Sequence, residues 1–238
     1  MIIANLQTDL KSLFIKALEA DPDYSEAHLQ LALIYQDEED FQNVENHFNV
    51  AIQSDSKMAQ KLDERGEELL KKFQFQNAKE QFMKAQGKKN HCADVYFQQS
   101  KYFLNHKKTN EALESLSHSI EMNPTLSEVH RDYGILLSQG NQIDNARLHL
   151  EKALDLNYGD FISHYRLGMI MVKMKDYDDA EQHFLSALDI DPGLVDCIVE
   201  LAALKLGIDQ KEEAKKYYEK AKTIVPELKH SKLEKLID

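Results

Sequence analysis

Apolar side chains recur along this chain at the three- and four-residue spacing of amphipathic helices, and short polar segments separate the stripes. The clearest pair of stripes lies between residues 167 and 188. Its members are Leu167, Ile170, Met171 and Met174, then Tyr177, Ala180, Phe184, Ala187 and Leu188. Helices of about 14 residues are marginal alone in water, so each is expected to bury its stripe against neighbouring helices.

The same pair of stripes returns along the chain at one constant period. A small residue stands early in each second helix, at Val44, Ala78, Ala112, Ala146, Ala180 and Ala214. Four residues later comes a large one: Phe48, Phe82, Leu116, Leu150, Phe184 and Tyr218. Small residues also mark where paired helices approach: Ala32, Gly66, Ser100, Gly134, Gly168 and Ala202. This period predicts six helical hairpins between Ser25 and Leu228, each packed on the next.

Helix ends follow the same phase, with two departures. Prolines that stop a helix stand at Pro22, Pro124, Pro192 and Pro226. Ser56, Asn90 and Tyr158 replace that proline in the other repeats, and Arg65 and Gln99 occupy a slot that is apolar elsewhere. Repeats two and three are therefore expected to pack less tightly than the others.

One run carries a family resemblance: Tyr165, Leu167, Gly168, Ala180, Phe184, Ala187 and Pro192. In these residues the sequence resembles the tetratricopeptide repeat family, whose units have about 34 residues, and the resemblance extends over residues 25 to 228 without insertion. It implies an all-α fold, a right-handed α-solenoid of helix-turn-helix repeats. The expected organisation is an N-terminal helix in 1–24, six repeats of that length in 25–228, and a C-terminal capping helix in 229–238.

The N-terminal helix has the phase of a second helix without its partner. Its apolar face is wider than one neighbour needs, and contains Leu6, Leu10, Leu13, Phe14, Ala17 and Leu18. Either this half repeat caps the array, or it is where a second molecule docks. At the other end, Leu233, Leu236 and Ile237 stand among Lys and Glu, as expected for a solvated cap.

The composition limits the classes of molecule that this chain is expected to bind. A net charge of −12 and a pI near 5.3 oppose binding to nucleic acid, which relies on clustered Lys and Arg. No apolar run approaches the ~18 residues of a membrane span, so no membrane insertion is expected. Cys92 and Cys197 form no zinc or disulfide motif and are expected to be reduced and buried, as in a cytoplasmic protein.

Local motifs for chemistry are missing from the sequence. The eight glycines never adopt a phosphate-loop spacing, and serine-hydrolase, zinc-protease and paired-cysteine motifs do not occur. Histidines do recur in pairs of equal spacing, at His28 and His47, His130 and His149, and His164 and His183. Partly buried structural histidines are the main interpretation, with a metal site as a minor alternative. No cofactor, no metal and no enzyme activity are predicted.

In the tetratricopeptide family the first helix of each repeat lines a concave face that receives a peptide or a helix. The resemblance therefore implies a peptide-binding groove made of Phe97, Lys101, Arg131, Ile135, Ile162, Tyr165, Arg166, Met169, Val172, Val199, Ala203 and Leu206. Several of these apolar residues lie off the stripe assigned to the core, so they have no intramolecular role in the repeat pattern.

The function expected from this groove is that of a non-enzymatic adaptor or scaffold that binds an apolar or amphipathic segment of a partner protein. One alternative is a structural scaffold that self-assembles through the N-terminal helix. Another is a bracket subunit of a larger assembly, secretion or envelope machine.

Overall fold

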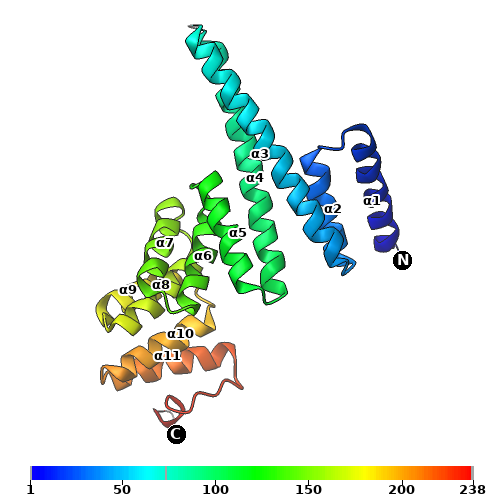
Figure 1. The fold of residues 1–238 in the computed structure, drawn as a ribbon. Coiled ribbons are helices and arrows are strands. Elements are labelled where there is room, and N and C mark those ends of the chain that lie inside the picture. The colour runs from blue at the N-terminus through cyan, green and yellow to red at the C-terminus, as the bar shows by residue number, and fades with distance from the viewer. Residues whose placement is uncertain (1, 73, 237–238) are drawn as a thin grey trace. The chain divides into compact units, whose positions relative to one another are not determined.

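A computed structural model describes residues 2–72 and 74–236, and this part of the chain contains helices and no strand. Contacts divide the chain into two compact units, Met1–Thr125 and Leu126–Asp238 (Figure 1). The first contains α1 (Ile2–Ala20), α2 (Ser25–Asp37), α3 (Phe41–Lys71), α4 (Phe75–Asn105) and α5 (Thr109–Met122). The second contains α6 (Ser127–Gln139), α7 (Ile143–Leu156), α8 (Phe161–Met174), α9 (Tyr177–Ile190), α10 (Val195–Gly207), α11 (Lys211–Ile224) and the 3₁₀ turn η1 (Glu234–Leu236).

Prolines end helices at the expected places. α1, α5, α9 and α11 each stop two residues before a proline. The residue between helix and proline is Asp21, Asn123 or Asp191 in three of these turns, and its side chain accepts a hydrogen bond from the backbone two residues later, at 3.0–3.2 Å. After α7, Asn157 makes the same bond to the Gly159 amide at 3.2 Å. Such turns replace the hydrogen bonds lost at a helix end.

The turn between the two helices of a repeat has its own periodic feature. Glu39, Lys107, Asn141, Lys175 and Asp209 all adopt the left-handed backbone conformation, with φ between 58° and 65°. They recur with the period of the repeat, except that the first two are separated by two periods. No glycine stands at these positions, and only Asn141 and Asp209 are residue types enriched in this conformation, so residue type does not mark the whole series.

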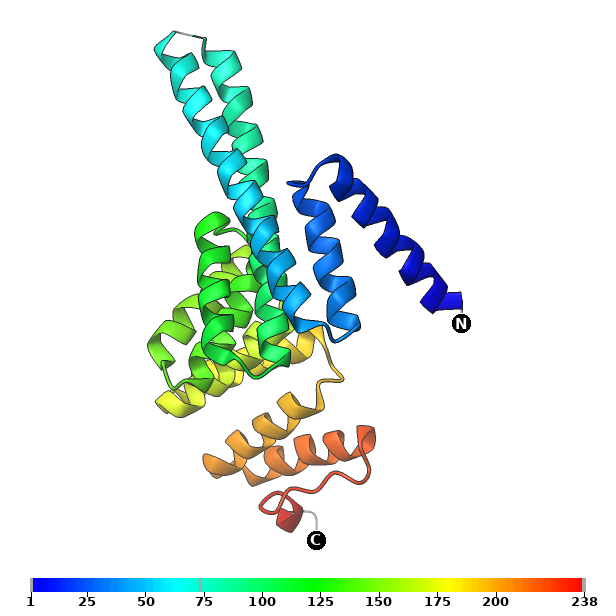
Figure 2. The ribbon, with the colours of Figure 1, turned by 45° about the vertical axis from the view of Figure 1, so that its right-hand side comes forward.

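The expectation of six separate hairpins is wrong at two junctions in the first unit. No break occurs at Ser56 or Asn90, and instead α3 and α4 are continuous helices of 31 residues each. They run antiparallel, and their connected ends extend past α2 (Figures 1 and 2). Helix propensity supplies the reason, because neither junction has the Pro or Gly that stops a helix in the other repeats.

Asp55, at the first continuous junction, has the sequence phase of the turn residues Asp21 and Asn157. Its carboxylate is fully buried and accepts hydrogen bonds from Ser25 Oγ and Lys88 Nζ, both at 2.8 Å. His91 also contacts Asp55, and its Nε2 lies 2.7 Å from Glu26 Oε2. This ionic cluster joins α2, α3 and α4 where a loop between repeats was expected.

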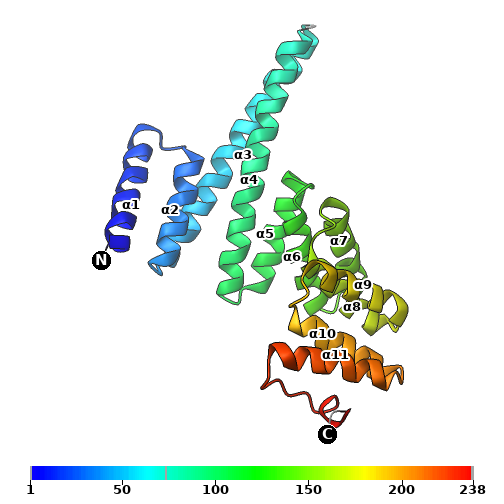
Figure 3. The same ribbon diagram turned by 180° about the vertical axis from the view of Figure 1, so that it is seen from behind.

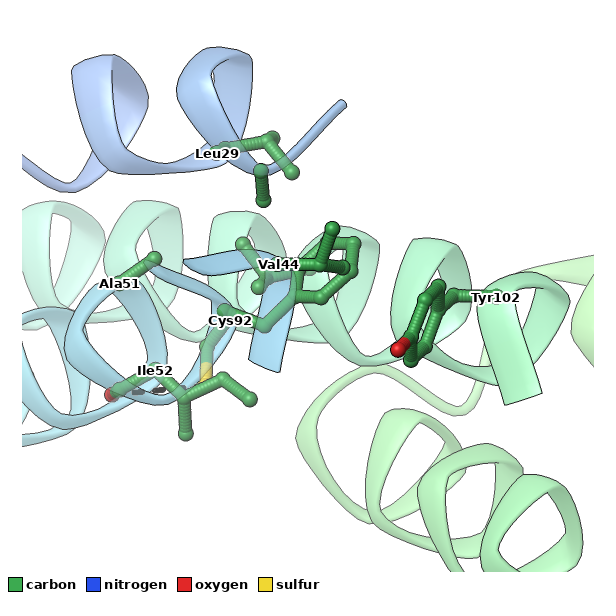
Figure 4. Close-up of a cluster of buried hydrophobic side chains, with 9 residues drawn as sticks. Leu29, Val44, Ala51, Ile52, Cys92 and Tyr102 are labelled. Atoms are coloured by element: carbon green, nitrogen blue, oxygen red, sulfur yellow. Dashed lines mark hydrogen bonds between the residues drawn. The ribbon is translucent and has the colours of Figure 1, made fainter. Parts of the chain in front are cut away.

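The core of the first unit forms between the halves of α3 and α4 that lie nearest α2. Its buried members are Leu29, Ala32, Val44, Phe48, Ala51, Ile52, Cys92, Val95 and Tyr102. Leu29 of α2 reaches toward Val44 of α3, and the Cys92 thiol contacts the Ile52 carbonyl at 3.9 Å (Figure 4). The second helix of repeat one therefore packs directly on the first helix of repeat three.

Within each hairpin, the glycine slots allow close helix packing. A Cβ on Gly168 would lie 2.6 Å from the ring of Phe184, a Cβ on Gly66 2.6 Å from Phe82, and a Cβ on Gly134 2.8 Å from Leu150. The Gly66 contact shows that repeat two keeps its internal pairing although both its junctions are straight.

The C-terminal segment differs from the expected capping helix, since the described part of 229–238 has only the η1 turn and residues 237–238 lie outside the description. Leu233 is nevertheless fully buried against Ala202 and Tyr218. The Tyr218 hydroxyl donates to the Leu228 carbonyl at 3.3 Å and accepts from the His230 amide at 3.1 Å. The segment leaves the end of α11 and turns back along that helix (Figure 3).

The continuous junctions should depend on residues 56 and 90. A proline inside a helix costs about 3 kcal/mol or more, so the double variant Ser56→Pro, Asn90→Pro should interrupt α3 and α4. Residue-specific ¹³Cα chemical shifts should lose helical values around both positions. The matched variant Ser56→Ala, Asn90→Ala should keep them, and helical shifts through residues 54–57 and 88–91 of the proline variant would contradict this account.

Gly168→Ala should destabilise the second unit, since its Cβ would meet the Phe184 ring at 2.6 Å. Overpacking of a well-packed core costs about 1–3 kcal/mol, measurable by urea unfolding. Gly87→Ala is the control, because no atom lies within 4 Å of its added Cβ, and replacing a helical glycine should stabilise by about 0.5–1 kcal/mol. Equal midpoints for the two variants would show that the close approach is not a constraint.

Candidate peptide-binding groove

Ten of the twelve predicted groove residues come together in the second unit. α8 contacts both α6 and α10, so the first helices of three repeats lie next to one another. Arg131 and Ile135 belong to α6, and Val199, Ala203 and Leu206 to α10. The α8 members are Ile162, Tyr165, Arg166, Met169 and Val172. All ten side chains are half-buried, and these ten residues are called the α8 groove below.

Phe97 and Lys101 lie on α4 of the first unit and are not part of the α8 groove. Phe97 is only 7% exposed, which is a core position rather than the open one expected. Lys101 is exposed, and its Nζ lies 3.9 Å from the centre of the Phe97 ring. A cation over an aromatic face is a favourable pair on its own, so these residues satisfy each other.

Tyr165 has an intramolecular role that the repeat pattern did not reveal. Its ring centre lies 6.2 Å from that of Phe184, the core aromatic of α9, and the planes are tilted by 41°. Burial, with the negative charges of Glu200 and Asp196, raises the pKa of Tyr165 to about 12. The phenol is therefore a neutral donor at physiological pH, and the side chain is half-buried against the core aromatic Phe184.

The two arginines of the α8 groove differ in their partners. Arg131 is paired, with Nε 2.9 Å from Asp132 Oδ1 and Nη1 3.6 Å from Asp160 Oδ2. Arg166 has no carboxylate partner among the residues that the structure describes, and its buried Nε has no hydrogen-bond acceptor there. Leaving a buried donor without a partner costs about 1–3 kcal/mol, more for a charged group.

Buried ionic chemistry in the second unit is structural. Lys205 Nζ, on α10, lies 2.6 Å from Glu181 Oε1, 2.9 Å from Glu213 Oε2 and 2.8 Å from Gln210 Oε1. Burial opposes its charge, but the two glutamates raise the pKa of Lys205 above its ordinary value. A lysine held protonated is no nucleophile. Sequence reasoning missed it, because a single Lys among apolar residues has no visible partner.

The three equally spaced histidine pairs meet across their hairpins as the repeat period places them. The Nδ1 atoms lie 2.7 Å apart in His28–His47, 3.0 Å in His130–His149 and 3.2 Å in His164–His183. His28 Nε2 donates to the Pro22 carbonyl at 2.9 Å, so in the neutral pair His47 Nδ1 donates to His28 Nδ1. Each pair is a hydrogen bond between the two helices of its hairpin. Among the described residues there is no group of three or more His, Cys, Asp or Glu side chains that could hold a metal ion.

The cysteines are both buried free thiols. Cys197 contacts the Phe184 carbonyl at 3.5 Å. Burial, with the charge of Glu200, raises the pKa of Cys197 to about 12. A protonated buried thiol is a poor nucleophile, so Cys197 acts as a small core residue.

The repeats of the second unit match a known family. Sequence profiles of the tetratricopeptide repeat match residues 161–194 and 195–227, which are α8–α9 and α10–α11 with their turns. Residues 161–227 are therefore two consecutive tetratricopeptide repeats. No curated protein matches the sequence of this chain. Tetratricopeptide repeats generally serve protein interaction rather than catalysis, and no helix among the described residues is long and apolar enough to cross a membrane.

Solved structures of repeat proteins are similar to it in fold. PilF of Pseudomonas aeruginosa matches with a TM-score of 0.68 at 19% identity, covering 95% of this chain and 88% of PilF. BtubC of P. vanneervenii matches with 0.68 at 15% identity, covering 93% and 89%. YrrB, described as a repeat protein with an unusual peptide-binding site, matches with 0.63 at 17% identity, covering 90% and 93%. At these identities the likeness concerns the fold.

Acid should destabilise this repeat protein through its histidine pairs. Burial, with the charges of His28 and Lys11, lowers the pKa of His47 to about 4. The unfolded chain binds a proton there below about 6.5, so it holds more protons than the folded chain between these values. Stability should therefore fall as pH drops from 6.5 to 4.

His47→Asn keeps a donor near Nδ1 but cannot titrate, so urea unfolding should show a shallower loss of stability over that range. The control His118→Asn changes a partly exposed histidine of α5 that belongs to none of the three pairs, and it should keep the wild-type slope. An unchanged slope in His47→Asn would contradict the assignment.

Proposed function

We propose that this protein is a non-enzymatic adaptor whose α8 groove binds an apolar or amphipathic segment of a partner protein. The observation that carries the proposal is the half-burial of Ile162, Met169 and Val172 on α8, in a row between α6 and α10. Exposed apolar rows of this kind on a rigid scaffold are typical of interaction sites. The resemblance to YrrB, a repeat protein with a peptide-binding site, supports the proposal.

The α8 groove has the mixture of groups that binding sites commonly use. Hot spots are enriched in Tyr and Arg, and Met adapts its shape to different apolar surfaces. Tyr165, Arg166 and Met169 provide these three side chains within one turn of α8. A pocket of about 410 Å³ adjoins Ala203 and Leu206 and is also lined by His230, Ser231 and Lys232 of the C-terminal segment.

More exposed apolar residues exist in the same unit, and several of them lie on the second helices. Leu148 of α7 is 61% exposed and Leu185 of α9 is 37% exposed. Isolated residues of this kind are normal on protein surfaces. They provide controls, because the same substitution can be made outside the groove.

Met169→Glu should abolish partner capture. The new carboxylate would replace the apolar contact with a charged group that must be desolvated when the partner binds, and it would lie one turn from Arg166, where it could pair with the guanidinium in place of a partner group. Affinity purification of the tagged full chain from its own cells, with quantitative mass spectrometry, should recover a partner with wild type and with Leu148→Glu, but not with Met169→Glu. Circular dichroism should show equal melting temperatures for the wild type and Met169→Glu. Capture by a folded Met169→Glu variant would show that binding lies elsewhere.

Self-assembly is a second candidate function, and one observation supports it. Leu10, Leu13 and Ile15 of α1 are 42%, 59% and 42% exposed, although Lys11 of the same helix packs on α2 with its Nζ 4.0 Å from the centre of the Tyr35 ring. Concentration-dependent light scattering that disappears in Leu13→Glu would favour this scaffold function over a monomeric adaptor.

A further inference from the structure

Arg166 stands out from the other charged groups of the α8 groove. Its buried Nε has no acceptor within the described part of the protein. Nη1 of the guanidinium lies 4.0 Å from the Met169 sulfur, and thioether sulfur is a weak acceptor. The guanidinium carbon lies 5.4 Å from the centre of the Tyr165 ring. The charge is held among apolar side chains and lacks an anion.

Acidic residues stand close by in sequence phase and still do not pair with it. Asp132 of α6 and Glu200 of α10 occupy the slot of Arg166 one period before and one period after. Asp132 already forms an ion pair with Arg131, in which its Oδ1 lies 2.9 Å from Arg131 Nε. Glu200 acts on Tyr165 and Cys197 through its charge, yet the described ion pairs do not include one between Glu200 and Arg166.

The charged residues on α6 and α10 beside Arg166 determine which charge a bound ligand should carry at each position. On the α10 side, Asp196 and Glu200 are negative and would repel an acid. On the α6 side, Arg131 is already shared by two carboxylates, those of Asp132 and Asp160. An anion is thus favoured only at the guanidinium of Arg166 itself, while the positions on either side favour apolar or basic groups. Met169 is flexible at three bonds, so it can move aside and open the guanidinium.

We propose that the α8 groove selects a peptide segment in which an Asp or Glu side chain binds Arg166 and a neighbouring apolar side chain packs on Met169 and Val172. This inference rests on the proposed function and specifies the partner for the same site. Arginine and carboxylate match because the planar guanidinium offers parallel N–H groups to two oxygens. Removal from water inside an apolar groove strengthens such a pair.

The test is a selection of random twelve-residue peptides, displayed with their C-termini joined to a carrier, on the full-length protein. The fused ends remove the terminal carboxylate as a source of the anion. Peptides selected by the wild type should be enriched in Asp or Glu beside an apolar residue. Arg166→Glu should reverse the preference toward Lys and Arg, while the control Arg147→Gln, on α7 and paired with Glu151, should keep it.

A selected peptide then allows a double-mutant cycle by fluorescence polarisation. Changing its acid to the amide should weaken binding to the wild type about ten- to hundredfold, the range for a hydrogen bond to a charged group. The same change should have little effect on Arg166→Gln. The role of Arg166 would be overturned by equal losses in both proteins or by selected peptides without acidic residues. Either result would leave the proposal that the α8 groove binds a peptide standing. If Met169→Glu selects the same peptides as the wild type, or if no peptide is selected, the proposed function fails as well.

Discussion

The close approach of two helices at a small residue is the constraint on which the rest of this protein depends. At Gly168 there is no room for a Cβ, because the ring of Phe184 would lie 2.6 Å away. That contact fixes the angle and depth of one hairpin, and its repetition at Gly66 and Gly134 gives the hairpins a common geometry. Neighbouring first helices can then lie side by side, which aligns equal repeat positions such as Arg131, Tyr165 and Val199.

Junctions between hairpins are governed by different chemistry, and they vary more. A turn forms where Asp, Asn, Pro or Gly can satisfy the freed backbone groups, as at Asn157 and Gly159. Around Ser56 and Asn90 these residues are missing or used otherwise, and α3 and α4 remain continuous. Asp55 has the sequence phase of a turn residue, but its carboxylate does not cap a turn. It instead forms hydrogen bonds with Ser25, Lys88 and His91. The repeat therefore tolerates two solutions at the same position.

Periodicity also decides where polar groups meet. The constant spacing of the paired histidines brings one from each helix of a hairpin to within 3.2 Å of its partner in three repeats. The repeat period itself places Asp132, Arg166 and Glu200 in one slot of successive first helices. The pairs of histidines satisfy each other and stabilise the hairpins, whereas Arg166 lacks an acceptor for its Nε among the described residues. Among equivalent positions of successive repeats, a charged group without a partner distinguishes a candidate binding residue from a structural one.

The sequence alone determined the helical hairpins, their period and the row of residues on α6, α8 and α10, because apolar spacing and small-residue slots are local and repeat six times. Tertiary structure alone decided what depends on neighbours far away in the chain. At Ser56 and Asn90 the local sequence permits a continuous helix, but the ionic cluster that joins α2, α3 and α4 around Asp55 forms only when these helices pack. The burial of Phe97, the contact of Tyr165 with Phe184 and the pairing of Lys205 with Glu181 and Glu213 depend on which side chains meet across helices. Periodicity gives the face on which a residue lies, but the partner it meets there is set only when the helices pack.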